Sequence, residues 1–481
     1  MKHPNILLLL SDDQGPWALG CAGNSEIITP RLDQLAREGM RFDQFFCVSP
    51  VCSPARASLL CGCIPSRHGI HDWLRDDTKE QAQIEYLAGQ QTLPSLLARA
   101  GYDCALSGKW HLGASHRPQQ GFSHWYCHKS GGGPYYGAPM YRNGQLYREP
   151  EYITKAITDD ALAYLESRKG KAQPFFLQVG YTAPHAPWLE NHPKEFTDLY
   201  QDCPFQSVPH LPPQPHRIFL TDDALRDERG NLTGYFAAVT AMDWHIGRIL
   251  DYLDREGMAQ DTLVIFTSDN GFCCGHHGLW GKGNGTYPIN MYEECVKVPF
   301  IARHSGQIPS GSTCSDLQSA YDFLPTVLDY IGLPCPRDDQ LPGQSFARAL
   351  QGLPGPGRED VVVMDEYGPN RMIRTSTHKF IARYPQGPCQ LFDLEKDPGE
   401  QHNLLEQQPH HPLAAQLLER LEQWFSRYAS AGMDGRDLPV YGCGQVGRVD
   451  QEGASPAFSL DDYIRKTPQY IKECRLEKQE Y

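Results

Sequence analysis

The chain has 481 residues, 40% of them apolar, which is enough to bury a large core; at this length we expect one large domain and a smaller one. Lys and Arg total 44 against 58 Asp and Glu, so the formal net charge is -14 and the chain has no broad basic face for nucleic acid phosphates. A nucleic acid partner is therefore not expected, and any anionic substrate must be bound by a local cluster of cations.

A short apolar run opens the chain. Residues 5–10 are too few for the core of a signal peptide and lead into Ser11-Asp12-Asp13 without a small-residue cleavage site, so they predict a buried strand. No stretch has the apolar length of a membrane span, and a membrane partner is not expected. The 16 cysteines lack regular spacing, which is typical of reduced thiols, and we expect a cytoplasmic location.

Strands and helices alternate over the first two thirds of the chain. Residues 30–38 predict a helix with Thr29 as N-cap, Pro30 at its first position and Gly39 after its end. Further helices are predicted at residues 92–100, around 157–165 and at 232–256, and further strands at 102–106, 174–181 and 262–266. This pattern predicts an α/β fold with a large, mostly parallel central sheet flanked by helices, whose ligands gather at the carboxyl ends of its strands.

The character of the sequence changes after Gly352. A segment rich in proline and glycine predicts a linker, strands are predicted at 361–366, 371–384 and 390–394, and a helix at 413–428. We therefore expect a catalytic domain over residues 1–352 and a smaller α+β subdomain with an antiparallel sheet over 353–481. No regular structure is expected after about Leu438.

Two pairs of oxygen ligands follow predicted buried strands. Asp12 and Asp13 come after the first strand, and Asp269 and Asn270 after the strand at 262–266. Carboxylate and amide oxygens on rigid elements suit a hard divalent cation such as Ca²⁺. The alternative is that each pair only caps a turn or a helix, as Asp and Asn often do.

The most specific motif lies at residues 51–60, Val-Cys-Ser-Pro-Ala-Arg-Ala-Ser-Leu-Leu, which is followed by Cys61-Gly62 and by Arg67-His68-Gly69. It resembles the sulfatase family, in which Cys-x-Pro-x-Arg directs oxidation of the cysteine to formylglycine at the start of a helix by a formylglycine-generating maturation enzyme. An isolated match of this length would instead suggest that Cys52 is a buried thiol before a helix.

Other segments resemble the same family in order along the chain. They are 108–113 (Gly-Lys-Trp-His-Leu-Gly), 183–187 (Ala-Pro-His-Ala-Pro), 268–271 (Ser-Asp-Asn-Gly), 277–283 (His-Gly-Leu-Trp-Gly-Lys-Gly), and 391–400 with Asn403-Leu404. The resemblance thus extends from residue 5 to about residue 404, and it implies an alkaline-phosphatase-like fold.

The resemblance also implies the roles of individual residues. One Ca²⁺ is expected on Asp12, Asp13, Asp269 and Asn270, and the catalytic set is Cys52, Arg56, Lys109, His111, His185 and Lys282. The lysines and Arg56 would neutralise the sulfate, His185 would protonate the departing alcohol, and His111 would act as the base. Taken singly, each lysine could be a solvated charge and each histidine a hydrogen-bonded loop residue. His276 and His277 stay unassigned, since zinc with Cys273 and Cys274 would lack a tetrahedral ligand spacing.

The expected substrate is a sulfated saccharide or an aryl sulfate. Asp72, Trp73 and Arg371 are candidate substrate contacts; with Trp17, His71 and residues 131–136 they are assigned to loops that could approach a sugar or be structural. Two other functions compete: a phosphonate monoester or phosphodiester hydrolase of the same superfamily, and a silent protein that binds a sulfated glycan. The sequence makes no prediction of the oligomeric state.

Overall fold

The computed structural model describes residues 3–217, 224–286, 288–336, 340–355, 357–365, 370–384, 387–436 and 444–449. Among these residues, ten strands form a central sheet in the order β13-β2-β12-β9-β1-β8-β4-β5-β6-β7. The strands are β1 (Asn5–Ser11), β2 (Met40–Phe42), β4 (Asp103–Gly108), β5 (Phe122–His128), β6 (Ala138–Arg142), β7 (Gln145–Glu149), β8 (Phe175–Gly180), β9 (Thr262–Ser268), β12 (Phe300–Arg303) and β13 (Ser312–Cys314).

The centre of the sheet is parallel, as predicted. Strands β9, β1, β8, β4 and β5 run in one direction, whereas β12, β6 and β7 join by antiparallel pairs. Parallel strands covered on both faces need apolar side chains on both, which explains the unbroken Ile-Leu-Leu-Leu-Leu run of β1.

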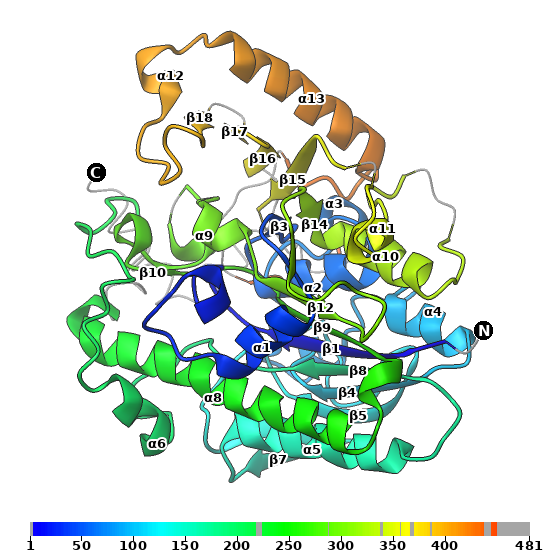
Figure 1. The fold of residues 1–481 in the computed structure, drawn as a ribbon. Helices are drawn as coiled ribbons and strands as arrows, with labels where there is room; N and C mark the ends of the chain where they lie inside the picture. Colours follow the sequence, from blue (N-terminus) through cyan, green and yellow to red (C-terminus); the bar gives the residue numbers. More distant parts are fainter. Residues whose placement is uncertain are drawn as a thin grey trace.

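The side chains of β1 alternate between two hydrophobic cores. Ile6, Leu8 and Leu10 pack into one core, and Leu7 and Leu9 into the other. The second core is covered by α1 (Pro30–Glu38), α5 (Ile153–Arg168) and α8 (Glu228–Arg255), of which α5 and α8 lie in the lower part of Figure 1. The first is covered by α2 (Cys52–Cys61), α4 (Leu93–Arg99) and α10 (Phe323–Tyr330) and extends to the C-terminal subdomain.

Shorter elements complete the main body. They are α3 (Pro65–His68), α6 (Lys194–Thr197), α9 (Glu293–Val296), α11 (Ala347–Leu350), the strand pair β3 (Phe45–Phe46) and β14 (Gln318–Ser319), and the hairpin β10 (Cys273–Cys274) and β11 (Trp280–Gly281). Among the described residues, no helix combines the length and the apolar character needed to cross a membrane.

The C-terminal subdomain is an antiparallel sheet under one long helix, at the top of Figure 1. Its strands are β15 (Asp360–Met364), β16 (Asn370–Thr375), β17 (His378–Arg383) and β18 (Gln390–Asp393), and its helices are α12 (Leu404–Gln407) and α13 (Pro412–Tyr428). The single strand predicted at 371–384 is wrong, because β16 and β17 form a hairpin. The hydroxyl of Thr375 accepts hydrogen bonds from the backbone N–H groups of Thr377 and His378. These side-chain bonds compete with the strand hydrogen bonds, so the chain turns here.

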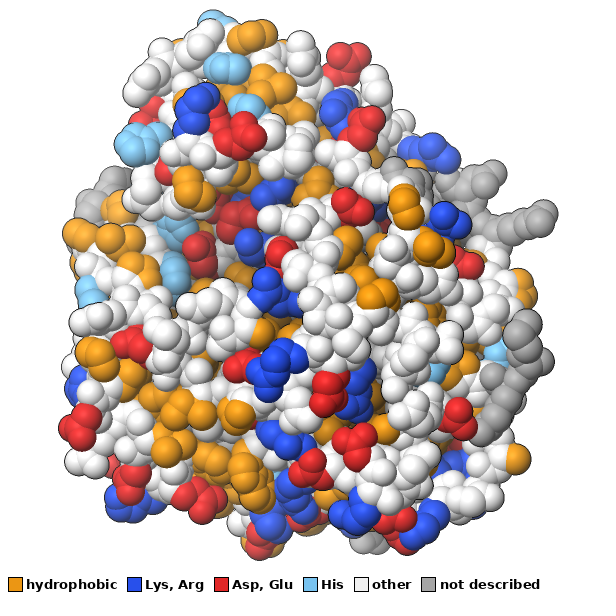
Figure 2. Space-filling model, viewed as in Figure 1, with side chains coloured by type: hydrophobic (Ala, Val, Ile, Leu, Met, Phe, Trp, Pro, Cys, Tyr) orange, Lys and Arg blue, Asp and Glu red, His pale blue; other side chains and the backbone are white. Residues whose placement is uncertain are grey.

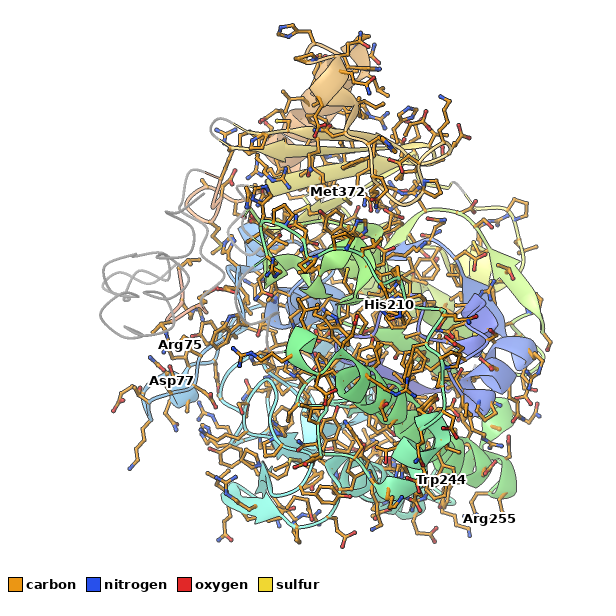
Figure 3. All side chains as sticks on the ribbon, turned by 90° about the vertical axis from the view of Figure 1, so that its left-hand side faces the viewer. Arg75, Asp77, His210, Trp244, Arg255 and Met372 are labelled. Carbon is orange, nitrogen blue, oxygen red and sulfur yellow. The ribbon has the colours of Figure 1, made fainter. Side chains whose placement is uncertain are left out.

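A short segment near the C-terminus forms no helix or strand, as predicted, but has a defined place in the fold. Residues 444–449, expected to have no regular structure, pack on the loop at residues 69–75, where Gln445 forms a parallel bridge with Leu74. We call residues 444–449 the C-terminal strap. Arg75 and Asp77, near the end of this loop, lie at the left of Figure 3, with Met372 of the C-terminal sheet above. Leu438 and residues 450–481 of the expected tail lie outside the described residues.

Candidate active site

The two predicted oxygen pairs meet at the carboxyl end of the sheet. Strands β1 and β9 are parallel neighbours with Ser11 opposite Ser268, so Asp12-Asp13 and Asp269-Asn270 leave the sheet side by side. The backbone N–H of Asp13 donates to Oδ1 of Asp269 at 3.3 Å. Parallel register thus brings together residues that are more than 250 positions apart.

Cys52 lies at the first position of the buried helix α2, facing these carboxylates. One ligand atom each from Asp12, Asp13 and Cys52 lies within 4.8 Å of the other two. Nζ of Lys282, which follows the β10–β11 hairpin, donates to Sγ of Cys52 at 2.8 Å and to Oδ1 of Asp13 at 2.6 Å. The thiol therefore contacts Lys282 and lies within 4.8 Å of a carboxylate oxygen of Asp12 and of Asp13.

Each buried carboxylate of the site has a cationic partner. Lys109, just after β4, pairs with Asp12, and neither side chain is exposed. Lys282 pairs with Asp13, and Nε of Arg56 donates to Oδ2 of Asp269 at 2.7 Å. An acidic chain thus carries two buried cations, Lys109 and Arg56, and the half-buried Lys282 at one point, which is the local cluster that binding of an anion requires.

Oxygen atoms at this edge of the sheet suit a divalent cation. Oδ1 of Asp12 and Oδ1 of Asn270 are buried and have no hydrogen-bond partner in the described part of the chain. The amide of Asn270 donates to Asp13 at 2.8 Å, which leaves its oxygen turned elsewhere. Buried oxygens are normally satisfied, so these atoms and the neighbouring carboxylates form a donor set that fits Ca²⁺.

The protonation of the site follows from its burial. Burial raises the pKa of the Cys52 thiol to about 12, against the opposing effect of the nearby lysines, so the thiol stays protonated and is a weak nucleophile at neutral pH. Burial, with Lys109 and Arg56, lowers the pKa of His111 well below its usual value. His111 is therefore a neutral imidazole, the form that can accept a proton.

Carbonyl acceptors fix the ring hydrogens of the two predicted catalytic histidines. Nε2 of His111 lies 3.2 Å from the carbonyl oxygen of Leu74, so Nε2 carries hydrogen and Nδ1 keeps its lone pair. Nδ1 of His185 lies 2.7 Å from the carbonyl oxygen of Ala186, and its Nε2 lies 3.7 Å from Oδ2 of Asp13. Each histidine thus has one nitrogen held by the backbone and one left for other chemistry.

The three predicted substrate contacts lie in two different parts of the structure. Arg371 is not in a loop: it lies in β16, 1% exposed, with its guanidinium 3.5 Å above the ring of Phe425 and paired with Asp434. Its assignment to a loop is therefore wrong, since it packs between sheet and helix in the subdomain; its role as a substrate contact stays a prediction. Asp72 is buried and accepts from the backbone of Gly444, while Trp73 is half-buried in the same loop.

The remaining candidates lie outside the Cys52 cluster. Trp17 stacks on Tyr235, and its ring is 4.9 Å from that of His276. His277 bonds Glu294 at 3.0 Å, and ligand atoms of His277, Glu294 and Glu400 lie within 4.8 Å of one another, while Sγ of Cys273 lies 3.5 Å from that of Cys295.

A cleft of about 500 Å³ runs below the C-terminal subdomain, where Figure 2 shows mixed Lys, Arg, Asp and Glu side chains. Trp17, Arg41, Glu294 and Lys297 line it, but Cys52 does not, so it is separate from the site.

Four contacts at the site were not predicted. Oγ of Ser53 donates to the carbonyl of His111 at 2.8 Å and accepts from the N–H of Leu74. The hydroxyl of Tyr235 donates to the carbonyl of Asp13, and that of Tyr135 to the carbonyl of His185. Only Ser53 carried a signal, because it lies inside the Cys-x-Pro-x-Arg motif.

The family model for sulfatases matches residues 4–333, more than half of the chain. The chain belongs to the sulfatase family. A second model, the C-terminal region of N-sulphoglucosamine sulphohydrolase, matches residues 275–427 of this sulfatase.

Named relatives agree with this assignment. The N-acetylglucosamine-6-O-sulfatase of Bacteroides thetaiotaomicron is 29% identical over 92% of this chain and 89% of its own. The human N-acetylgalactosamine-6-sulfatase is 32% identical over 73% of this chain and 66% of its own. The solved structure of BT4656 in complex with its substrate D-glucosamine-2-N,6-O-disulfate is 27% identical, with a TM-score of 0.76, and the match covers 90% of this sulfatase and 99% of that chain.

Proposed function

We propose that this sulfatase hydrolyses sulfate monoesters of saccharides, with residue 52 matured from cysteine to formylglycine as its nucleophile and one Ca²⁺ at Asp12, Asp13, Asp269 and Asn270. The observation that carries the proposal is the contact of the Cys52 side chain with Lys282 beside two buried aspartates. As a thiol with a pKa of about 12, Cys52 would be a poor nucleophile, which supports its conversion to another group.

Formylglycine and Ca²⁺ would supply the nucleophile and the Lewis acid that the unmodified side chains do not provide. The hydrated aldehyde offers one hydroxyl to attack sulfur and a second whose deprotonation expels sulfate, and Ca²⁺ would acidify the attacking hydroxyl. The orphaned oxygens of Asp12 and Asn270 support the metal assignment. A maturation enzyme of the formylglycine-generating kind is the partner that this chemistry requires.

The residues of the chain neutralise charge and move protons. Lys109 and Lys282 would contact the sulfate oxygens, and Arg56 would hold Asp269 in place while adding positive charge. His185 would act in the form that carries hydrogen on both nitrogens: Nδ1–H stays bonded to the carbonyl of Ala186, and Nε2 gives its proton to the departing sugar oxygen. Nδ1 of His111, buried and without a partner among the described residues, is suited to accept the proton of the second hydroxyl.

We further propose a sulfated hexosamine as the first substrate to test. The two named relatives are 6-sulfatases of N-acetylhexosamines, and the compared complex holds a glucosamine with a 6-O-sulfate. A cytoplasmic enzyme, as the cysteine usage suggests, would act on small saccharides after import.

Two measurements test the proposal. Mass spectrometry of the peptide that contains Cys52, from chain co-expressed with a maturation enzyme, should give the mass of an aldehyde in place of the thiol. The matured chain should then release sulfate from 6-O-sulfated N-acetylglucosamine or N-acetylgalactosamine and lose this activity in Cys52→Ala. Faster turnover of a nitrophenyl phenylphosphonate than of any sulfate ester would establish the competing hydrolase, and binding without turnover would establish a silent glycan-binding protein.

A further inference from the structure

A run of three glycines lies against both predicted catalytic histidines. Gly131, Gly132 and Gly133 lie between β5 and β6. A Cβ atom at Gly131 would lie 2.2 Å from Cε1 of His111, and one at Gly132 would lie 2.8 Å from Cε1 of His185. Cβ atoms do not approach other heavy atoms this closely, so neither position has room for a side chain.

The space that the two histidine rings occupy explains these glycines better than their backbone conformation does. None of the three adopts the left-handed backbone region in which glycine is favoured. The other two ring atoms nearest to the Gly131 position, Nε2 and Nδ1 of His111, would lie at 2.5 and 2.6 Å, so the glycine faces the ring itself. At Gly132 the corresponding distances to Nδ1 and Nε2 of His185 are 2.9 and 3.3 Å.

The loop cannot easily move away from the rings. The N–H of Lys129 donates to the carbonyl of Pro139 at 2.9 Å, and the hydroxyl of Ser130 donates to the carbonyl of Gly132 at 3.3 Å. On the far side, Tyr135 is fully buried, and its hydroxyl donates to the carbonyl of His185 at 2.8 Å. The glycines therefore lie on a backbone anchored at both ends, one end of which is bonded to His185.

We propose that Gly131 and Gly132 are positioning residues that hold the imidazoles of His111 and His185, each serving a different half of the reaction. The inference rests on the proposed function. In the first half the attacking hydroxyl of residue 52 releases its proton to solvent, its oxygen forms a bond to sulfur, and the bond between sulfur and the sugar oxygen breaks. His185, which must enter this step with hydrogen on both nitrogens, gives its Nε2 proton to the sugar oxygen and becomes neutral. In the second half Nδ1 of His111 takes the proton of the remaining hydroxyl, a C=O bond forms, and sulfate leaves with the electron pair of its bond to carbon.

The chain offers a matched control for this inference. A Cβ at Gly133 would have its nearest neighbours, ring atoms of His128, at 3.5 Å, an ordinary contact. The variants Gly131→Ala, Gly132→Ala and Gly133→Ala therefore make the same chemical change on the same loop, and differ in which histidine the new methyl group meets.

We expect the loss of hydrolysis rate in each variant to depend differently on the leaving group of the ester. A general acid contributes about 10²–10⁴-fold to a poor leaving group, so Gly132→Ala should slow hydrolysis of a sugar 6-O-sulfate about 10²-fold more than that of nitrophenyl sulfate, which leaves without a proton. Gly131→Ala should slow both esters alike, and intact-mass spectrometry during turnover should show enzyme that retains sulfate. Gly133→Ala should stay within about threefold of the parent on both esters, below the range of a lost proton transfer.

Crystal structures of the unmatured Cys52 form of each variant provide a readout that needs no turnover. Rotation of His111 in Gly131→Ala and of His185 in Gly132→Ala, with both rings unmoved in Gly133→Ala, is the expected result; unmoved rings in all three would overturn the inference. Equal losses on both esters in Gly132→Ala, without a leaving-group difference, would overturn it as well. The new methyl group in Gly132→Ala overlaps its histidine less than that in Gly131→Ala does. Gly132→Ala alone therefore tests the inference if Gly131→Ala does not fold. Failure of the parent enzyme to cleave any sulfate ester would instead reject the proposed function.

Discussion

At the scale of single residues, the site is a set of charges that are already balanced. Lys109, Lys282 and Arg56 each pair with one of the three aspartates that we assign to the metal. Such buried pairs are costly to break, because removal of one partner leaves a charge without compensation. The arrangement holds the carboxylates in place, while the oxygen atoms of Asp12 and Asn270 that lack partners remain available to a cation.

The Asn270→Ala variant tests the metal site. Calcium at about 100 times its dissociation constant should stabilise the parent chain by about 2.7 kcal/mol, because it binds only the folded state. Loss of the Asn270 oxygen should weaken this response without changing the net charge. Thermal unfolding with and without calcium measures the effect.

Asn24→Ala is the control, because Asn24 is also buried but its side-chain oxygen caps a turn at Glu26 and Ile27. This variant should lose stability and keep the full response to calcium. An equal response to calcium in Asn270→Ala would exclude this residue as a ligand.

The charged residues of the site can be predicted from the sequence, but the residues that pack against the proposed catalytic histidines cannot. Asp12 and Asp269 follow apolar strands, and Cys52 lies in a motif, so both patterns are visible along the chain. The roles of Gly131 and Tyr135 depend on how far a loop lies from His111 and His185 in space, and one sequence contains no such distance. From the sequence alone, these glycines belong to a loop that could approach a sugar or be structural.

At the scale of elements, the C-terminal strap supports the loop beside the site. The side chain of Gln445 is fully buried, accepts from the N–H of His71 at 2.8 Å and donates to the carbonyl of Gly69 at 2.9 Å. The supported loop includes Leu74, whose carbonyl is bonded to His111 and whose N–H is bonded to Ser53. The strap is therefore linked to Ser53, the neighbour of Cys52, through hydrogen bonds at both ends of the loop backbone between Gly69 and Leu74.

Substitution of Gln445 by Ala should loosen this support. Unsatisfied buried groups cost about 1–3 kcal/mol each, so we expect the free energy of unfolding in urea to fall by about that amount. The rate of hydrolysis should fall as well, since Leu74 would hold His111 less firmly.

Gln423→Ala, on the exposed face of α13, should change neither quantity. Equal stability and activity in Gln445→Ala and the parent would show that the strap is dispensable.

Element boundaries show where local sequence rules suffice. Helix α1 begins at Pro30 and ends at Glu38, as Pro at the first position and Gly after the end predict. Helix α4 lies within the predicted range 92–100, but Thr92 is its N-cap and not its first residue. Helix α8 starts at Glu228 instead of 232, because the side chain of Asp227 caps it by accepting from Gly230. The division of the chain at residue 352 stays a prediction.

At the scale of the whole molecule, a buried ion network joins the C-terminal sheet to the main body. Nζ of Lys379, in β17, lies 2.8 Å from carboxylate oxygens of Glu293 and Glu400 and 2.8 Å from the carbonyl oxygen of Met291. Glu293 belongs to α9 of the main body, and Lys379 is fully buried. The subdomain is thus fixed by charge as well as by the shared hydrophobic core.

Lys379→Met should destabilise the protein. Two buried carboxylates would lose their common cation, a loss that typically costs about 3–5 kcal/mol. Thermal unfolding measures the change. Lys396→Met removes an exposed lysine paired with Asp393 and should leave the unfolding temperature unchanged; similar unfolding temperatures of the two variants would count against the network.

The same network predicts how stability depends on pH. Burial acts to raise the pKa of Glu293, but Lys379 and Arg374 outweigh it and lower the pKa to about 2 from the usual 4.5. A lowered carboxyl pKa gives stability that is complete above 4.5 and is lost as pH falls toward 2. The unfolding temperature should therefore fall across this window, and it should fall less in Lys379→Met. Parallel curves for the two proteins would contradict this origin of the pH dependence.

The hydrogen bonds of Gln445 have a practical consequence for anyone who prepares this enzyme. A product clipped after Tyr428 would retain both hydrophobic cores, every proposed calcium ligand and the full set of described helices, so it would pass as intact by its helical content. It would nevertheless lack the strap behind the loop that touches His111. Slow turnover in such a sample would be mistaken for incomplete oxidation of Cys52, and the mass of the whole chain distinguishes the two faults.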